Sequence, residues 1–164
     1  MPMAVGRSWT YEVTSGFSSR VAEVRVVRRI AVDGCNGYEL AGPAGVSRLA
    51  WRGDRLIAGR LGDSLFSPAL PLLTARTGAP RQIWHGRMDF LGVQHAASAT
   101  IDQQSEPLTE GGRTFPTLHS TVTVRLGGRK IEVQCWFASG TGLVREVQRT
   151  GESEDVELDW LRGP

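Results

Sequence analysis

The 164-residue chain has little cysteine and no CxxC motif. Its two cysteines, Cys35 and Cys135, stand a hundred positions apart. This spacing indicates neither a disulfide framework nor a zinc ribbon, and it leaves open whether the two thiols are free. Cys135 occupies an alternating apolar position typical of a small core residue, whereas Cys35 lies in the turn-forming stretch DGCNG.

Long apolar runs are also absent. No stretch approaches the ~18 apolar residues of a membrane-spanning helix, and the N-terminal MPMAVGRSWTYEV lacks the hydrophobic core of a signal peptide. The chain as given is therefore expected to be cytoplasmic, and to be envelope-associated if its true N-terminus lies upstream. With no linker and no internal repeat, residues 1–164 are expected to form a single β domain.

Lysine is nearly absent, since 18 of the 19 basic residues are arginine, against 17 acidic residues. A strong arginine bias suits phosphate or nucleic-acid recognition, but it also arises from coding composition alone. The C-terminal stretch GESEDVELD would repel a polyanion through Glu152, Glu154, Asp155, Glu157 and Asp159. No nucleic-acid partner is therefore expected.

Helical periodicity is nearly absent, and a two-residue alternation of apolar and polar positions takes its place. The alternation is clear in residues 20–33, 117–126 and 130–138. Turn-forming residues separate these strands from the others that we predict, so that the chain is expected to form about ten or eleven strands. The other predicted strands span residues 8–14, 37–41, 46–51, 55–61, 81–90, 94–103, 143–150 and 155–161.

Strands with one apolar and one polar face are typical of an antiparallel sheet that is solvated on one side. Ten or so such strands curl rather than stay flat. The predicted fold is therefore all-β, a single strongly curled antiparallel sheet of about ten strands that forms a half-barrel or a barrel. The proline-broken stretch LFSPALPLL is predicted to be a short lid over its mouth, through Leu65, Phe66, Leu70, Leu72 and Leu73.

The stretch CWFASGTGLVREVQRT contains a Gly-x-Gly that invites comparison with a phosphate-binding loop. Such a loop needs its glycines to lead into a helix N-terminus, whereas Gly142 is followed by strand-like alternation. We therefore predict a hairpin. No G-x-S-x-G elbow is present, and Asp54, Asp63, Asp89 and Asp102 all stand beside turns, where aspartate has structural roles.

The three histidines, His85, His95 and His119, offer the alternative of a metal-dependent enzyme. No H-x-H or H-x-x-x-H pair organises them in advance, and no cofactor is expected. A single-stranded nucleic-acid module is the other alternative, with fragments of a basic aromatic surface at Trp51, Trp84 and Trp136. By parity Trp136 lies on the polar face of its strand, where it covers a second core, packs under the Leu-rich segment or awaits a ligand.

Both ends of the chain resemble a known group of proteins. The C-terminal WFASGTGLVREVQRT is similar to the W-Y/F-A-x-G-x-G-L-V hairpin of small bacterial β-rich proteins, many of them lipoproteins, that include the TapB-like group. The N-terminal MPMAVGRSWTYEV resembles their P-L-x-x-G-x-x-W-x-Y opening. The resemblance implies the curled antiparallel sheet of the LolA and LolB lipoprotein carriers, with a concave apolar surface for lipid or another hydrophobic partner. It implies no catalytic motif.

These observations predict a non-enzymatic binding protein with a concave apolar face. The expected partner is a hydrophobic small molecule, a lipid or acyl chain, or a protein, and the chain is expected to be a monomer or a homodimer. The predicted ligand-binding residues are Trp9, Tyr11, Leu70, Leu72, Leu73, Trp84, Trp136 and Phe137.

Overall fold

The protein is described by a computed structural model that covers residues 3–150 and 156–162. Every regular element within these residues is a β-strand. The strands are β1 (Ser8–Ser15), β2 (Ser18–Val32), β3 (Cys35–Gly42), β4 (Gly45–Arg52), β5 (Arg55–Leu61), β6 (Ser64–Thr74), β7 (Gln82–Phe90), β8 (Val93–Glu110), β9 (Arg113–Leu126), β10 (Arg129–Ala138), β11 (Gly142–Thr150) and β12 (Val156–Arg162).

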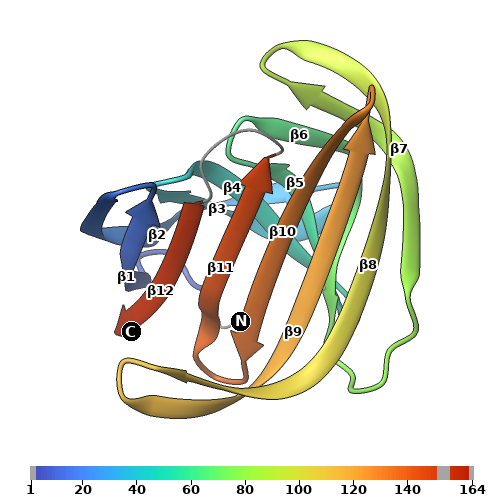
Figure 1. Ribbon diagram of the computed structural model, residues 1–164. Helices are drawn as coiled ribbons and strands as arrows, with labels where there is room; N and C mark the ends of the chain where they lie inside the picture. Colours follow the sequence, from blue (N-terminus) through green and yellow to red (C-terminus); the bar gives the residue numbers. More distant parts are fainter. Residues whose placement is uncertain (1–2, 151–155, 163–164) are drawn as a thin grey trace.

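The strands form one closed antiparallel barrel (Figure 1). Each strand pairs with its neighbours in sequence, and β12 pairs with β1 to close the sheet. The all-β antiparallel prediction is confirmed. The sheet takes the closed form rather than the half-barrel, and it has twelve strands rather than about ten because the segment expected to be a lid is itself a strand.

That lid prediction is wrong, because β6 belongs to the barrel wall. It pairs with β5 along its length and with β7 over Ser64–Ser67. Two register shifts interrupt its ladder with β5, and prolines are tolerated in strands where regular pairing is broken. Beyond Ser67 the strand packs into the interior, where the carbonyl of Leu72 accepts a hydrogen bond from the hydroxyl of Ser120 on β9.

The inward-facing side chains fill most of the barrel. Trp9, Leu56, Leu70, Met88 and Ile101 are among the largest fully buried side chains. At one end the long β8–β9 hairpin extends below the other strands (Figure 1). There Phe115 packs edge-on against Trp160 of β12, with ring centroids 5.2 Å apart. An aromatic pair therefore covers this end of the barrel.

The Gly-x-Gly stretch connects β10 to β11 as an antiparallel hairpin, as predicted. Gly140 and Gly142 have φ angles of +77° and +104°, a region that glycine enters without the steric cost of a Cβ atom. The pairing of β10 with β11 has one register shift, between Trp136 and Phe137 of β10. This shift determines which side chains of β11 face the interior.

Candidate functional site

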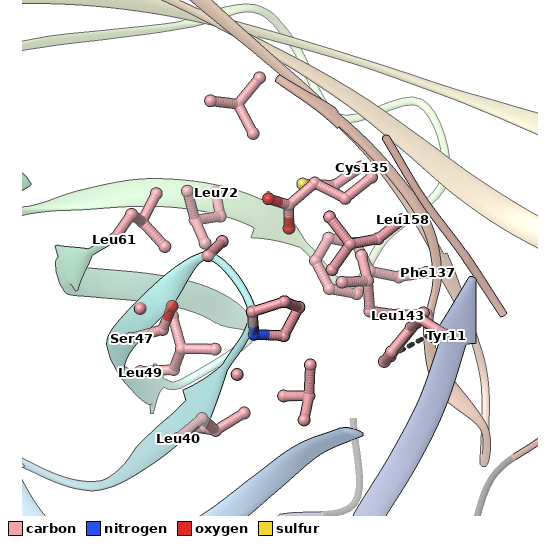
Figure 2. A pocket seen from close by; sticks show the side chains of 17 residues that line it. Tyr11, Leu40, Ser47, Leu49, Leu61, Leu72, Cys135, Phe137, Leu143 and Leu158 are labelled. Atoms are coloured by element: carbon pink, nitrogen blue, oxygen red, sulfur yellow. Dashed lines mark hydrogen bonds between the residues drawn. The ribbon is translucent and has the colours of Figure 1, made fainter. Parts of the chain in front are cut away.

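An apolar cavity of about 70 Å³ remains inside the barrel. Figure 2 shows Tyr11, Cys135, Phe137, Leu143 and Leu158 on one side of it, from β1 and β10 to β12. Leu40, Ser47, Leu49 and Leu61, from β3 to β5, lie on the other side. The cavity therefore lies between two halves of the barrel wall that are far apart in the sequence.

One carboxylate, that of Glu146 on β11, lies among these apolar side chains. Glu146 pairs with Cys135 of β10 and with Leu158 of β12, and both of these residues face the core. Side chains directly opposite each other in an antiparallel pair lie on the same face of the sheet. Glu146 therefore points into the barrel.

A β-bulge at Val144 is the cause of this orientation. Phe137 pairs with Leu143, whereas Trp136 pairs with Arg145, so Val144 has no partner across the hairpin. If the ladder were regular, Val144 would pair with Trp136 and Glu146 would lie opposite Gln134, on the outer face. A one-residue shift moves every following side chain to the other face of the sheet.

Burial controls the protonation of Glu146. The Glu146 side chain is partly buried among apolar side chains, and this desolvation raises its pKa to about 7. Among the described residues, neither a hydrogen bond nor an ion pair of this side chain offsets the cost. The carboxyl group is therefore poised to change its charge near neutral pH.

Two further titratable groups, Tyr11 and Cys135, line the same cavity. The Tyr11 hydroxyl donates a hydrogen bond to the carbonyl oxygen of Leu143 at 2.9 Å, drawn as a dashed line in Figure 2. Burial raises the pKa of both groups, and the nearby Glu146 raises it further. Both therefore stay neutral over the range in which Glu146 titrates.

A wider cavity of about 340 Å³ forms a mouth at one end of the barrel. This end carries the turns between β1 and β2, β3 and β4, and β5 and β6. Its lining is more polar than that of the inner cavity and includes Arg20, Asp63 and Gln148. Pro43, Ala44 and Leu61 line both cavities, so the β3–β4 turn and the end of β5 separate the mouth from the interior.

The eight residues predicted to bind a ligand are distributed over three environments. Tyr11, Leu72 and Phe137 line the inner cavity. Trp9, Leu70, Leu73 and Trp84 are buried in the core but do not line that cavity. The eighth, Trp136, lies on the outer face. The ligand-binding role of these residues stays a prediction.

Two of the buried tryptophans tie distant segments together. The indole Nε1 of Trp9 donates a hydrogen bond to the carbonyl oxygen of Thr141 at 2.7 Å. That of Trp84 donates to the carbonyl oxygen of Pro68 at 3.2 Å. Since buried tryptophan N–H groups need an acceptor, these bonds allow both rings to be buried in the core.

Trp136 is covered on the outer face by its neighbours on adjacent strands. Its ring stacks on that of His119, with centroids 4.1 Å apart and planes 10° apart, and the guanidinium of Arg145 lies 5.4 Å from its centroid. Its Nε1 donates to Oε1 of Glu106 at 2.5 Å, and Nδ1 of His119 lies 3.0 Å from the same oxygen. Trp136 therefore packs in a small outer cluster and not under the Leu-rich segment.

The three histidines are not brought together. His95 pairs with Met88, a core residue, and so faces inward. His119 belongs to the outer cluster, and His85 is exposed on the outer face. Among the described residues, no group of three or more His, Cys, Asp or Glu side chains is placed to hold a metal ion.

The two cysteines are free thiols, with Cys135 buried and Cys35 partly exposed. Of the C-terminal acidic stretch, Glu152, Glu154 and Asp155 lie outside the described residues, whereas Glu157 and Asp159 form ion pairs with Arg145. Within the described ranges, no helix has the length and apolar character needed to cross a membrane.

Sequence reasoning missed Glu146, Ser47 and the Pro43–Ala44 turn. The sequence analysis assigned no face to Glu146, and nothing in the local sequence marked Val144 as a bulge. Ser47 lines the inner cavity from β4. The strand that contains Ser47 was predicted, but the inward orientation of the Ser47 side chain was not.

Comparisons with known proteins define the fold alone. No model of a known protein family matches the chain, and neither does any curated protein. A solved "putative lipoprotein" from Parabacteroides distasonis ATCC 8503 matches with 10% identity and a TM-score of 0.57, over 99% of this chain and 97% of that one. A "putative exported protein with YmcC-like fold" from Bacteroides fragilis NCTC 9343 matches with 12% identity and a TM-score of 0.52, over the same shares.

These likenesses agree with the predicted resemblance to small bacterial β-rich proteins, without singling out the TapB-like group or the LolA and LolB carriers. The chain shares a YmcC-like barrel fold with these proteins.

Proposed function

We propose that this protein is a non-enzymatic binding protein that takes a small amphipathic molecule through the mouth of the barrel into its inner cavity. The observation that carries the proposal is the cavity itself, left open in an otherwise filled core and adjacent to the mouth. Unfilled apolar space lowers the stability of a protein. A ligand that fills the space would recover part of that loss.

The size of the cavity limits the ligand. At about 70 Å³ it is smaller than a cavity of about 150 Å³ that binds benzene. A lipid or acyl chain would therefore enter only in part, with the remainder in the mouth. Displacement of the Pro43–Ala44 turn, which lines both spaces, would join them for a longer ligand.

A place at the bacterial envelope forms part of this proposal. It is supported by the proteins that share the fold, which are described as a "putative lipoprotein" and a "putative exported protein", and by the sequence resemblance to the TapB-like group, many of whose relatives are lipoproteins. The likeness to LolA and LolB applies in a modified form, because a closed barrel takes a ligand through its end and not along an open concave face. Fractionation of cells that express the gene from its native locus tests the placement, and recovery only in the cytoplasm would contradict it.

Binding of an uncharged, environment-sensitive fluorescent probe that carries an alkyl chain tests the function. We expect saturable binding by the full chain and a loss of at least tenfold in affinity on Ser47→Leu, because the larger side chain fills the cavity. Ser98→Leu is the matched control, since Ser98 pairs with the exposed His85 on the outer face. The proposal fails if the wild-type protein takes up no probe, or if the two variants bind it equally well.

A further inference from the structure

The lining of the inner cavity contains a negative group and no positive one. Among the described residues that line it, none is an arginine, a lysine or a histidine. The Tyr11 hydroxyl is already bonded to the Leu143 carbonyl, and the other side chains are apolar apart from Ser47 and Cys135. The carboxyl group of Glu146 is therefore the one charged group available to a ligand here.

Another buried carboxylate of this barrel has partners within the chain. On the outer face, Glu39 accepts hydrogen bonds from Arg28 at 2.8 Å and from Arg48 at 3.0 Å. These contacts lower the pKa of Glu39. Glu146 lies in a less polar environment without such a contact, although enclosing a carboxyl group without a partner is costly. The contrast indicates that the partner of Glu146 comes from outside the chain.

We infer that Glu146 pairs with the ammonium group of an amphiphilic amine whose apolar body fills the inner cavity and extends toward the mouth, an inference that rests on the proposed function. An ammonium group supplies both the charge and the hydrogen-bond donors that the carboxylate lacks. An alcohol supplies a donor without the charge, and a carboxylate ligand meets a like charge. We therefore expect the cavity to bind an amine more tightly than the corresponding alcohol, and the alcohol more tightly than the corresponding acid.

The direction of the ligand follows from β11. Gln148 lies two residues beyond Glu146 on the same face of the strand and lines the mouth. Side chains two positions apart on a strand lie side by side along one face. The head group therefore lies inward at Glu146, and the body passes Leu61 and the Pro43–Ala44 turn toward Gln148.

Amine binding requires Glu146 to be ionised, so the affinity depends on pH. The other titratable groups that face Glu146 are Tyr11 on β1 and Cys135 on β10, and both stay neutral. At the mouth the charged groups are Arg20 and Asp63. An alkylamine stays protonated below about pH 10. We expect its affinity to rise about tenfold per pH unit from pH 5 toward 7 and to level off above.

The test uses hexylamine, hexan-1-ol and hexanoate with the full chain, measured by titration calorimetry at pH 8. We expect hexylamine to bind at least tenfold more tightly than hexan-1-ol, and hexanoate to bind most weakly. Glu146→Gln should weaken hexylamine at least tenfold and change hexan-1-ol by less than threefold. Glu132→Gln is the control, because Glu132 lies on β10 outside the cavity, beside Lys130, and it should change neither affinity.

The outcomes separate the inference from the proposed function. If hexan-1-ol binds but hexylamine binds no more tightly, or if Glu146→Gln leaves the amine affinity unchanged, the inference is overturned and the binding function stands. If none of the three compounds and no uncharged fluorescent alkyl probe binds, the proposed function itself fails. Should Glu146→Gln not fold, the pH dependence of the wild-type protein decides, since a flat amine affinity between pH 5 and 8 overturns the inference.

Discussion

A single unpaired residue in β11, Val144, decides which side chains of that strand reach the interior. The bulge places Arg145 outside, beside Trp136, and Glu146 inside, opposite Cys135. A carboxyl group in such a position lowers stability whenever it is ionised and has no partner. At the residue scale, the candidate site thus carries a local cost that a bound cation would offset.

This cost predicts a pH dependence of stability. The pKa of Glu146 is about 7 in the folded protein and 4.5 as a free side chain, so the folded state binds more protons between these values. Stability is then fully present below about pH 4.5 and declines as the pH rises toward 7. Glu146→Gln should remove this decline and make the variant more stable than wild type at pH 8, by roughly 2–3 kcal/mol.

Urea unfolding of both proteins at pH 5 and pH 8 measures the effect. Asp159, whose pKa burial raises to about 6, contributes a decline of the same sign in both proteins, so the difference between them isolates Glu146. A difference in unfolding free energy that is the same at the two pH values would contradict the prediction.

At the scale of the elements, the β3–β4 and β5–β6 turns fit closely against each other at the mouth. A Cβ atom added to Gly62 would lie 2.8 Å from the carbonyl oxygen of Ala44, and one added to Gly45 would lie 3.3 Å from Cα of Gly62. These contacts seat the Pro43–Ala44 turn between the mouth and the inner cavity. The close approach of these glycines thus fixes the position of the Pro43–Ala44 turn.

Gly62→Ala tests this contact against Gly53→Ala. Both glycines have positive φ angles, +54° and +62°, but a Cβ atom at Gly53 meets nothing within 4 Å. We expect Gly53→Ala to cost about 1 kcal/mol from backbone strain alone. Gly62→Ala should cost about 1–3 kcal/mol more. Thermal or urea unfolding compares the two, and equal costs would show that the turns do not depend on this close approach.

At the scale of the whole molecule, closure removes the strand edges. An open curled sheet leaves two edges on which another chain can pair, which is why a homodimer was expected alongside a monomer. Here β1 pairs with β12 from Thr10 to Ser15. These two edges are therefore not available for pairing between chains, and we expect a monomer.

We predict a monomer at 100 µM by light scattering coupled to size-exclusion chromatography. A variant that ends at Thr150 lacks β12 and exposes the edges of β1 and β11, so it should self-associate or aggregate. The full-length chain at the same concentration is the control. A full-length dimer, or a truncated chain that stays monomeric and folded, would show that closure does not govern association.

Much of the fold follows from the sequence. Apolar–polar alternation, clearest in three segments, and turn-forming residues together predicted eleven of the twelve strands. Turn residues such as the Gly-x-Gly of the β10–β11 hairpin also indicated where the strands connect. The strand that was missed, β6, contains Pro68 and Pro71 and a nearly continuous apolar run, so its local pattern resembles a loop. Its strand character depends on pairing with β5, which is a tertiary contact.

The candidate site follows from the sequence only in part. Tyr11, Leu72 and Phe137 were predicted at a ligand-facing surface, and they line the cavity. Glu146 was not predicted there, because strand parity assigns faces only as long as the register is regular, and the bulge at Val144 breaks it. Trp136 was correctly placed on the polar face of β10. The side chains that cover its ring, His119 and Arg145, come from neighbouring strands and are therefore a tertiary feature.

The all-β class, the antiparallel order and nearly all of the strands can be predicted from the sequence, since they depend on local periodicity and turn chemistry. Closure, the bulge, the inward course of β6 and the cavity were decided by the tertiary structure. Each of these features depends on contacts between residues far apart in the chain. The pairing of β1 with β12 joins the two ends of the sequence, and the position of Glu146 depends on Cys135 and Leu158 on either side of it.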